Sequence, residues 1–144
     1  MAPFPVSSTS VETDHIKRIA RVLGRSKVNE RISSAGCYNC RTVAGSSSYS
    51  QHAWGNALDL FPKGHKDPEL VQVDLRAIAR AVVAHATKVT IANRGRKLRV
   101  AQVIDHDARQ IWTPSSGWQV YTGTTGAHIH VSADPMRTGK PSCA

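Results

Sequence analysis

Apolar residues recur at helical intervals in a segment near the start of the chain. They run from Ile16 to Leu23 and stop at Gly24, which predicts an amphipathic helix that ends at a glycine cap. Thr9 and Glu12 have the spacing of a capping box, so we expect this helix to begin close to them.

A second and clearer helical pattern follows Asp67. The order Asp67-Pro68-Glu69 supplies an N-cap, a first-turn proline and an acid suited to the positive end of the helix dipole. Leu75 and the apolar positions after it then share one face. The pattern predicts a helix that ends near Thr87.

The rest of the chain is rich in short β-branched runs. Residues 57–61 read as a strand, and later runs cover 89–92, 98–104, 110–113 and 128–132. Turn-forming residues at 93–95 and 114–117 separate the later runs. Helices and strands therefore mix without a regular βαβ alternation, and we predict an α+β fold with a central antiparallel β-sheet and two or three helices.

Length and charge narrow the function classes. The 144 residues suit one domain, and we expect a flexible N-terminus at 1–10, the domain at 11–135 and a C-terminal tail at 136–144. The net charge of +9 favours polyanionic partners. Few aromatic residues accompany the basic run at 94–99, so we do not expect nucleic acid as the partner.

The first ten residues lack the basic and apolar order of a secretory signal, and no stretch is long enough to span a bilayer. We therefore expect no signal peptide and no membrane partner. Of the three cysteines, Cys37 and Cys40 have the CxxC spacing of half a zinc site, but no second pair completes it. We expect them to be a buried pair or a local disulfide, with Cys143 further along the chain.

Two histidine groups lie in segments predicted to be strands. In His128-Ile129-His130 the two imidazoles project from one face of a strand. His52 and Asp59 are opposite in strand parity, so they can meet only if the chain turns, and Gly55 lies between them. Imidazole nitrogens with one carboxylate suit zinc, and three protein ligands leave a fourth position for water, as in catalytic sites. Such a site favours amide hydrolysis.

The pattern SxHxxGxAxD followed by HxH resembles the superfamily of lysostaphin-type endopeptidases, D-alanyl-D-alanine metallopeptidases and the hedgehog signalling domain. The likeness covers residues 41–132 and is strongest to its carboxypeptidase branch, peptidase family M15, in phage and actinobacterial forms. It implies a hedgehog or D-Ala-D-Ala-peptidase-like fold, with His52, Asp59 and His130 as zinc ligands. It also implies that Ser50 and Arg41 bind substrate, Arg41 through a carboxylate.

The same resemblance makes His128, the first histidine of HxH, the catalytic general base or electrostatic partner. The sequence departs from the pattern at this point, because members of the branch commonly have a glutamate before the last zinc histidine. This chain has no glutamate after Glu69 and has Thr124, Thr125 and Gly126 there. Ala127 stands where relatives often have an aspartate that would orient an imidazole.

We therefore predict a zinc-dependent peptidase that hydrolyses peptidoglycan stem peptides or cross-links, as a phage lysin or a virion-associated wall hydrolase. It would reside in the virion, or in the host cytoplasm before release, and act on the bacterial cell wall. The expected partners are peptidoglycan peptides, with anionic wall polymers and other virion proteins as further ones. The alternative is a zinc-binding structural or interaction module that has little or no turnover, for example a virion tail component.

Overall fold

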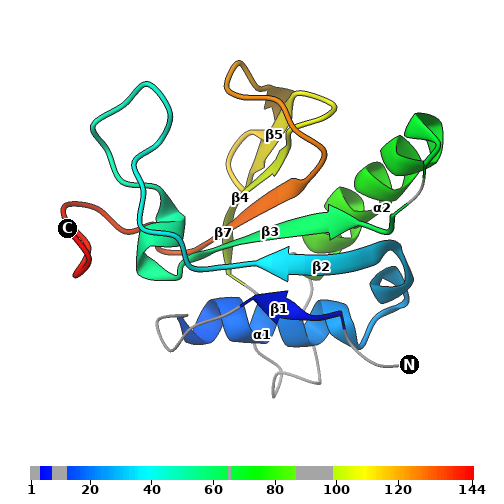
Figure 1. The fold of residues 1–144 in the computed structure, drawn as a ribbon, viewed down its shortest axis with the longest axis horizontal. Helices are drawn as coiled ribbons and strands as arrows, with labels where there is room; N and C mark the ends of the chain where they lie inside the picture. Colours follow the sequence, from blue (N-terminus) through cyan, green and yellow to red (C-terminus); the bar gives the residue numbers. More distant parts are fainter. Residues whose placement is uncertain (1–3, 8–12, 65, 87–98) are drawn as a thin grey trace.

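The computed structural model describes residues 4–7, 13–64, 66–86 and 99–144. Two α-helices and seven strands occur in this part of the chain (Figure 1). The helices are α1 (Asp14–Gly24) and α2 (Pro68–Ala86), and the short 3₁₀ helices are η1 (Lys27–Arg31) and η2 (Gln51–Trp54). The strands are β1 (Val6–Ser7), β2 (Ile32–Gly36), β3 (Ala57–Pro62), β4 (Val100–Asp105), β5 (Gln110–Thr113), β6 (Gly117–Val120) and β7 (Ile129–Ala133).

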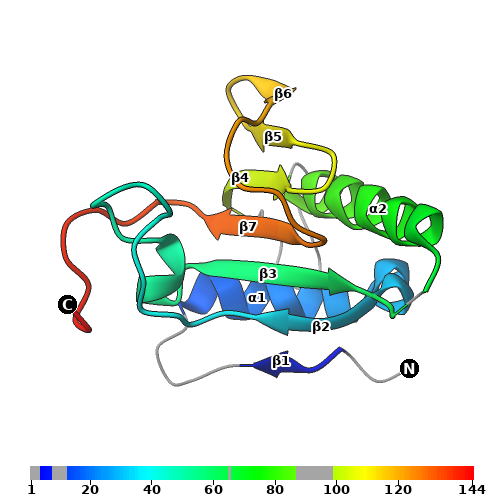
Figure 2. The ribbon, with the colours of Figure 1, turned by 45° about the horizontal axis from the view of Figure 1, so that its top comes forward.

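All seven strands form one sheet, in the order β1-β2-β3-β7-β4-β5-β6 (Figure 2). The short β1 pairs with β2 in parallel, and the other six strands are antiparallel. The predicted α+β class with an antiparallel sheet is therefore confirmed. The run predicted as a strand at 89–92 lies outside the described residues. The strands β1, β2 and β6 were not predicted. β1 lies in the segment expected to be a flexible N-terminus, and β6 begins at Gly117, where the sequence indicated a turn.

Both predicted helices begin with side-chain caps. The Thr13 hydroxyl accepts a hydrogen bond from the Ile16 backbone N–H, so Thr13 is the N-cap of α1. The expected cap at Thr9 lies outside the described residues. At α2, the Asp67 carboxylate accepts the Glu69 backbone N–H at 2.9 Å. The helix then starts at Pro68, as the sequence predicted.

The two helices cover one face of the sheet, and the core lies between these layers (Figure 2). Alternate residues of β3 point to opposite faces, so Leu58 and Leu60 are fully buried in the core. Ile129 and Val131 do the same on β7. The residues between them, Asp59 and His130 among them, face the opposite side of the sheet from α1 and α2, where His52 of η2 lies 3.1 Å from Asp59.

The C-terminal segment is tied to the loop before η2. A disulfide joins Cys40 to Cys143 across a sequence separation of 103 residues. Cys37 is free and buried, so the expectation of a Cys37–Cys40 disulfide is wrong. The sulfur of Cys40 bonds instead to a cysteine that only the tertiary fold brings near it.

Hydrogen bonds reinforce this attachment. The Gln51 side chain accepts the Arg137 N–H at 2.8 Å and donates to the Arg137 carbonyl at 2.9 Å. The segment after β7 is thereby held against η2. None of the helices in the described residues is long and apolar enough to cross a membrane.

Candidate metal centre

Three separate elements supply the candidate ligands. His52 lies in η2, Asp59 in β3 and His130 in β7. Asp59 and His130 are direct cross-strand partners in the β3–β7 pair, so the register alone brings them together. His52 reaches them because Gly55 ends η2 in the left-handed conformation, with φ of 66°. The turn predicted at Gly55 is confirmed.

The ligand atoms converge around one carboxylate oxygen. Asp59 Oδ1 lies 3.1 Å from His52 Nε2 and 3.2 Å from His130 Nδ1. One ligand atom from each of the three residues lies within 4.8 Å of the others. His52, Asp59 and His130 therefore form a candidate metal-binding triad, with the donor types that the sequence predicted.

Hydrogen bonds fix which nitrogen of each histidine is available. His52 Nδ1–H donates to the Cys37 carbonyl at 2.5 Å, which leaves Nε2 with its lone pair toward Asp59. His130 Nε2 lies 2.7 Å from the Ser132 hydroxyl, and His130 Nδ1 lies 3.2 Å from Asp59 Oδ1. When Nδ1 binds a metal, Nε2 carries the ring proton and donates it to Ser132. Such outer partners set the tautomer of metal-binding histidines in general.

The environment of His52 fits a metal. Its Nε2 is buried and has no hydrogen-bond partner, although an unpaired buried polar atom is costly. A cation bound between His52, Asp59 and His130 would satisfy this atom. The donor set of two imidazoles and a carboxylate suits zinc among several divalent metals.

The charge states match a ligand set. Burial on its own would raise the pKa of Asp59, but the His130 and His52 imidazoles beside it outweigh burial and hold this pKa far below its ordinary value. For His130, burial lowers the pKa below 6.5, although Asp59 acts in the opposite direction. At neutral pH an ionised carboxylate therefore faces a neutral imidazole, and both are ready to bind a cation.

His128 lies at the rim of the triad. Its Nε2 is 3.9 Å from Asp59 Oδ1, and its side chain is 25% exposed. Burial is the largest cause that lowers its pKa below 6.5. Phe61 flanks the ring, with centroids 5.8 Å apart. A neutral, partly accessible imidazole beside the ligands can accept a proton from a reacting group.

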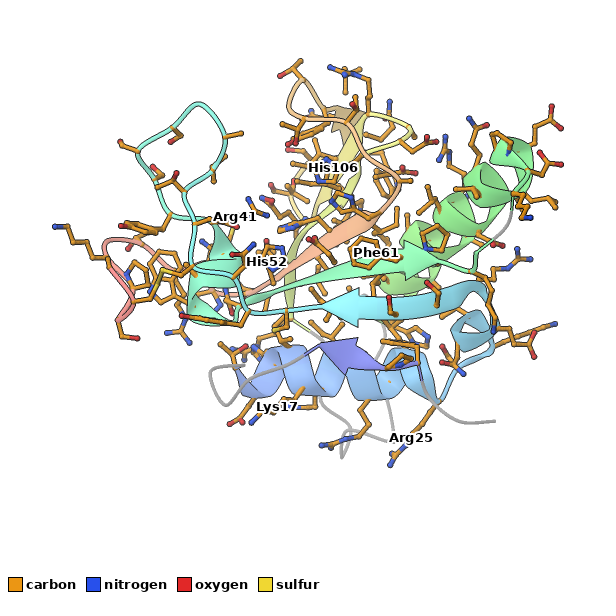
Figure 3. The ribbon with its side chains drawn as sticks, viewed as in Figure 1. Lys17, Arg25, Arg41, His52, Phe61 and His106 are labelled. Carbon is orange, nitrogen blue, oxygen red and sulfur yellow. A yellow bond between two sulfur atoms is a disulfide. The ribbon has the colours of Figure 1, made fainter. Side chains whose placement is uncertain are left out.

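A further histidine, His106, was not predicted to belong to this site. Its ring stacks on that of His128 with centroids 4.3 Å apart and an interplanar angle of 31°. His106 is 7% exposed, and its Nδ1–H donates to the Thr124 carbonyl at 2.7 Å. Figure 3 shows His52, Phe61 and His106 around the same stretch of β3 and β7.

The two residues predicted to bind substrate occupy different environments. Ser50 is buried and is the N-cap of η2, where its hydroxyl accepts the His52 backbone N–H at 3.3 Å. In the structure Ser50 therefore orients His52, one of the candidate ligands. Arg41 is exposed, and its carbonyl accepts the Ser50 N–H at 2.9 Å. Substrate binding by either residue stays a prediction.

An open cleft of about 460 Å³ lies apart from the triad. It is at the start of α1, beside the segment that follows β7, and Arg18 and Arg137 are among the residues that line it. Because Asp14 and Asp134 also line it, its charges are mixed. None of the three candidate metal ligands contributes to this cleft.

Comparison with known families gives one match. The family described as "Extensin-like protein C-terminus" matches residues 4–95, which is more than half of the 144-residue chain. The matched range includes His52 and Asp59, and it ends before His106, His128 and His130. No curated protein and no solved structure matches the chain.

This match corrects the family resemblance that the SxHxxGxAxD and HxH motifs indicated. The identification with peptidase family M15 is wrong, because the family whose model matches is a different one. Similar spacing of Ser50, His52, Gly55 and Asp59 arises here in another family. The hedgehog or peptidase-like fold and the carboxylate-binding role of Arg41, which rested on that resemblance alone, stay predictions.

Proposed function

Since the chain belongs to the Extensin-like protein C-terminus family, whose description names no reaction, we propose a function from its own residues. The protein is a zinc-dependent peptidase that hydrolyses amide bonds in peptides of the bacterial cell wall. The observation that carries this proposal is the convergence of His52, Asp59 and His130, whose ligand atoms lie within 4.8 Å of one another around the unpaired, buried Nε2 of His52.

The ligand count favours catalysis over a purely structural metal. Three protein ligands leave one tetrahedral position open, whereas structural zinc sites are closed by four. Asp59 and His130 are also partly open to solvent, with side-chain exposures of 17% and 13%. A substrate can approach from the face of the sheet opposite α1 and α2.

When bound, zinc would make a water molecule more acidic and polarise the carbonyl of the substrate. We assign to His128 Nε2, which lies 3.9 Å from Asp59 Oδ1, the task of accepting a proton from the attacking water and returning it to the leaving amine. The chain has no glutamate after Glu69, so we assign this proton transfer to an imidazole. His106, stacked on the far side of His128, holds that ring in place.

The substrate assignment is supported by charge. With a net charge of +9, the protein is attracted to anionic polymers, among which are those of bacterial walls. Attraction of this kind raises the local concentration of wall peptides around the site. We therefore propose that the protein acts at the wall and that anionic wall polymers are a second, non-cleaved partner.

The test is product mapping by mass spectrometry after incubation of zinc-loaded protein with whole peptidoglycan. His130→Ala is the blank, and His15→Ala is the matched control, because His15 bonds to the Asp134 carbonyl and not to the triad. New peptide ends from the wild type and from His15→Ala, absent with His130→Ala, would support the peptidase. Tight zinc binding by the wild type without any product would instead favour the structural or interaction module.

A further inference from the structure

A single guanidinium on α2 bonds to the two acidic residues that flank His106. Arg76 Nη1 lies 3.1 Å and 3.4 Å from the two carboxylate oxygens of Asp105, and Arg76 Nη2 lies 2.9 Å from Asp107 Oδ2. The fork geometry of arginine allows one side chain to hold both carboxylates at once. These bonds anchor the C-terminal end of β4 to α2, which lies on the helix-covered face of the sheet.

The Asp105 end of this contact is shielded from water, and the Asp107 end is partly exposed. Asp105 has a side-chain exposure of 2%, whereas Arg76 and Asp107 are 33% and 28% exposed. Asp105 Oδ1 also accepts the Ala108 backbone N–H at 2.9 Å, which closes the turn after β4. A buried carboxylate with all of its partners in place tolerates little displacement.

His106 is the first residue after β4, and its ring lies toward the metal site, with its centroid 4.3 Å from that of the His128 ring and 6.4 Å from that of the His130 ring. A shift of the Arg76 contact would therefore displace His106, whose ring lies at the metal site. The His106 backbone N–H donates to the His128 carbonyl at 3.4 Å, and the two rings stack 4.3 Å apart. The location of His128 therefore depends on that of His106.

The loop before β7 is tightly fitted to the same pair of rings. The Thr124 carbonyl accepts the His106 Nδ1–H. A methyl group added to Gly126 would lie 3.0 Å from two atoms of the His128 ring. The loop backbone therefore passes close to the His128 ring, and a side chain at position 126 would displace that ring.

We propose that Arg76 is a positioning residue of the active site. It holds His106 through Asp105 and Asp107, and His106 in turn seats His128 beside Asp59. This inference rests on the proposed peptidase function for its effect on turnover, but the positioning itself can be measured without any substrate. The metal ligands lie on other elements, so zinc affinity should not depend on Arg76.

The experiment compares Arg76→Gln with Asp107→Asn, which removes the charge of one arm and keeps the Asp105 contact. Arg31→Gln is the matched control, since Arg31 bonds to Asp74 of the same helix at 2.8 Å and contacts no residue of the site. If Arg76→Gln fails to fold, Asp107→Asn decides the question. Zinc affinity is measured for each variant by chelator competition.

Positioning is read from acylation of His106 by diethyl pyrocarbonate, located by peptide mass spectrometry. Both test variants should acylate several times faster at His106 than the wild type, with zinc affinity unchanged and Arg31→Gln at the wild-type rate. On peptidoglycan, kcat should fall by roughly 10- to 100-fold with little change in KM, as for other residues that act by orienting a site.

Unchanged acylation and unchanged kcat in a folded variant would overturn the positioning role. Equal acceleration in Arg31→Gln would also overturn it, because the effect would then be a general loss of stability. If the wild type cuts nothing while His106 still becomes reactive in the test variants, the proposed peptidase function fails and the positioning role of Arg76 stands.

Discussion

Ser132 determines which tautomer of His130 is favourable, and its replacement by alanine gives a quantitative test of the metal site. Ser132 is fully buried, and its hydroxyl oxygen lies 2.7 Å from His130 Nε2, where it can accept the Nε2–H. Metal binding through Nδ1 forces the ring proton onto Nε2. In Ser132→Ala that proton has no partner whenever the metal is bound.

Metal-free Ser132→Ala avoids most of the free-energy cost of this unpaired donor. Its ring proton can move to Nδ1 and be donated to Asp59 Oδ1, which lies 3.2 Å away. An unpaired buried donor costs about 1 to 3 kcal/mol, so zinc affinity should fall roughly 5- to 150-fold. This range agrees with the loss of about 10- to 100-fold seen in general when a hydrogen-bond partner of a metal ligand is removed.

Competition with a chromophoric chelator measures this affinity. Ser26→Ala is the control, because Ser26 Oγ donates to the Leu23 carbonyl at 2.9 Å at the end of α1, on the helix-covered side of the sheet. We expect the control to bind zinc like the wild type. Equal affinity in Ser132→Ala and the wild type would refute the assignment of Nδ1 as the ligand atom of His130.

Three further outcomes are expected. Asp59→Asn should lose the metal through gel filtration, as measured by elemental analysis, because the carboxylate faces both histidines; retained metal would contradict the triad. Cys143→Ser should lower the free energy of unfolding by about 2–5 kcal/mol in denaturant, since a disulfide that closes a long loop stabilises strongly; an unchanged midpoint would contradict this. Metal-free protein should lose stability as the pH falls below 6.5, because burial lowers the folded-state pKa of His128 and His130 and the unfolded chain binds these protons more tightly. The contribution is complete above pH 6.5, and a flat urea-denaturation profile down to about pH 5 would refute it.

Local patterns in the sequence were sufficient for the elements with strong signals. The cap and apolar face of α2 predicted Pro68–Ala86 closely, and the run at 110–113 is β5. In contrast, β2 has the sequence ISSAG, in which small residues replace the β-branched ones that mark a strand. Its strand conformation comes from pairing with β3. This pairing cannot be predicted from the residues of β2 alone.

The residues of the site likewise divide into those that local sequence patterns predicted and one that depends on tertiary structure. The identities of His52, Asp59 and His130 followed from ligand chemistry and from the turn at Gly55. The contribution of His106 did not, because it depends on the β4–β7 register, in which Ile104 pairs with His130. Register between distant strands is a tertiary property. Disulfide connectivity is another, and Cys40 and Cys143 meet only in the folded chain.

The central position of β7 has a consequence for how the chain reaches its native state. It is the last strand of the sheet in chain order, and yet it joins β1-β2-β3 to β4-β5-β6. During synthesis these two half-sheets have no shared strand until residues 129–133 have left the ribosome. Such non-local pairing slows folding, and it completes the metal site in the same step, because β7 carries His130. Until β7 is in place the edges of β3 and β4 are unpaired, and unpaired strand edges favour aggregation.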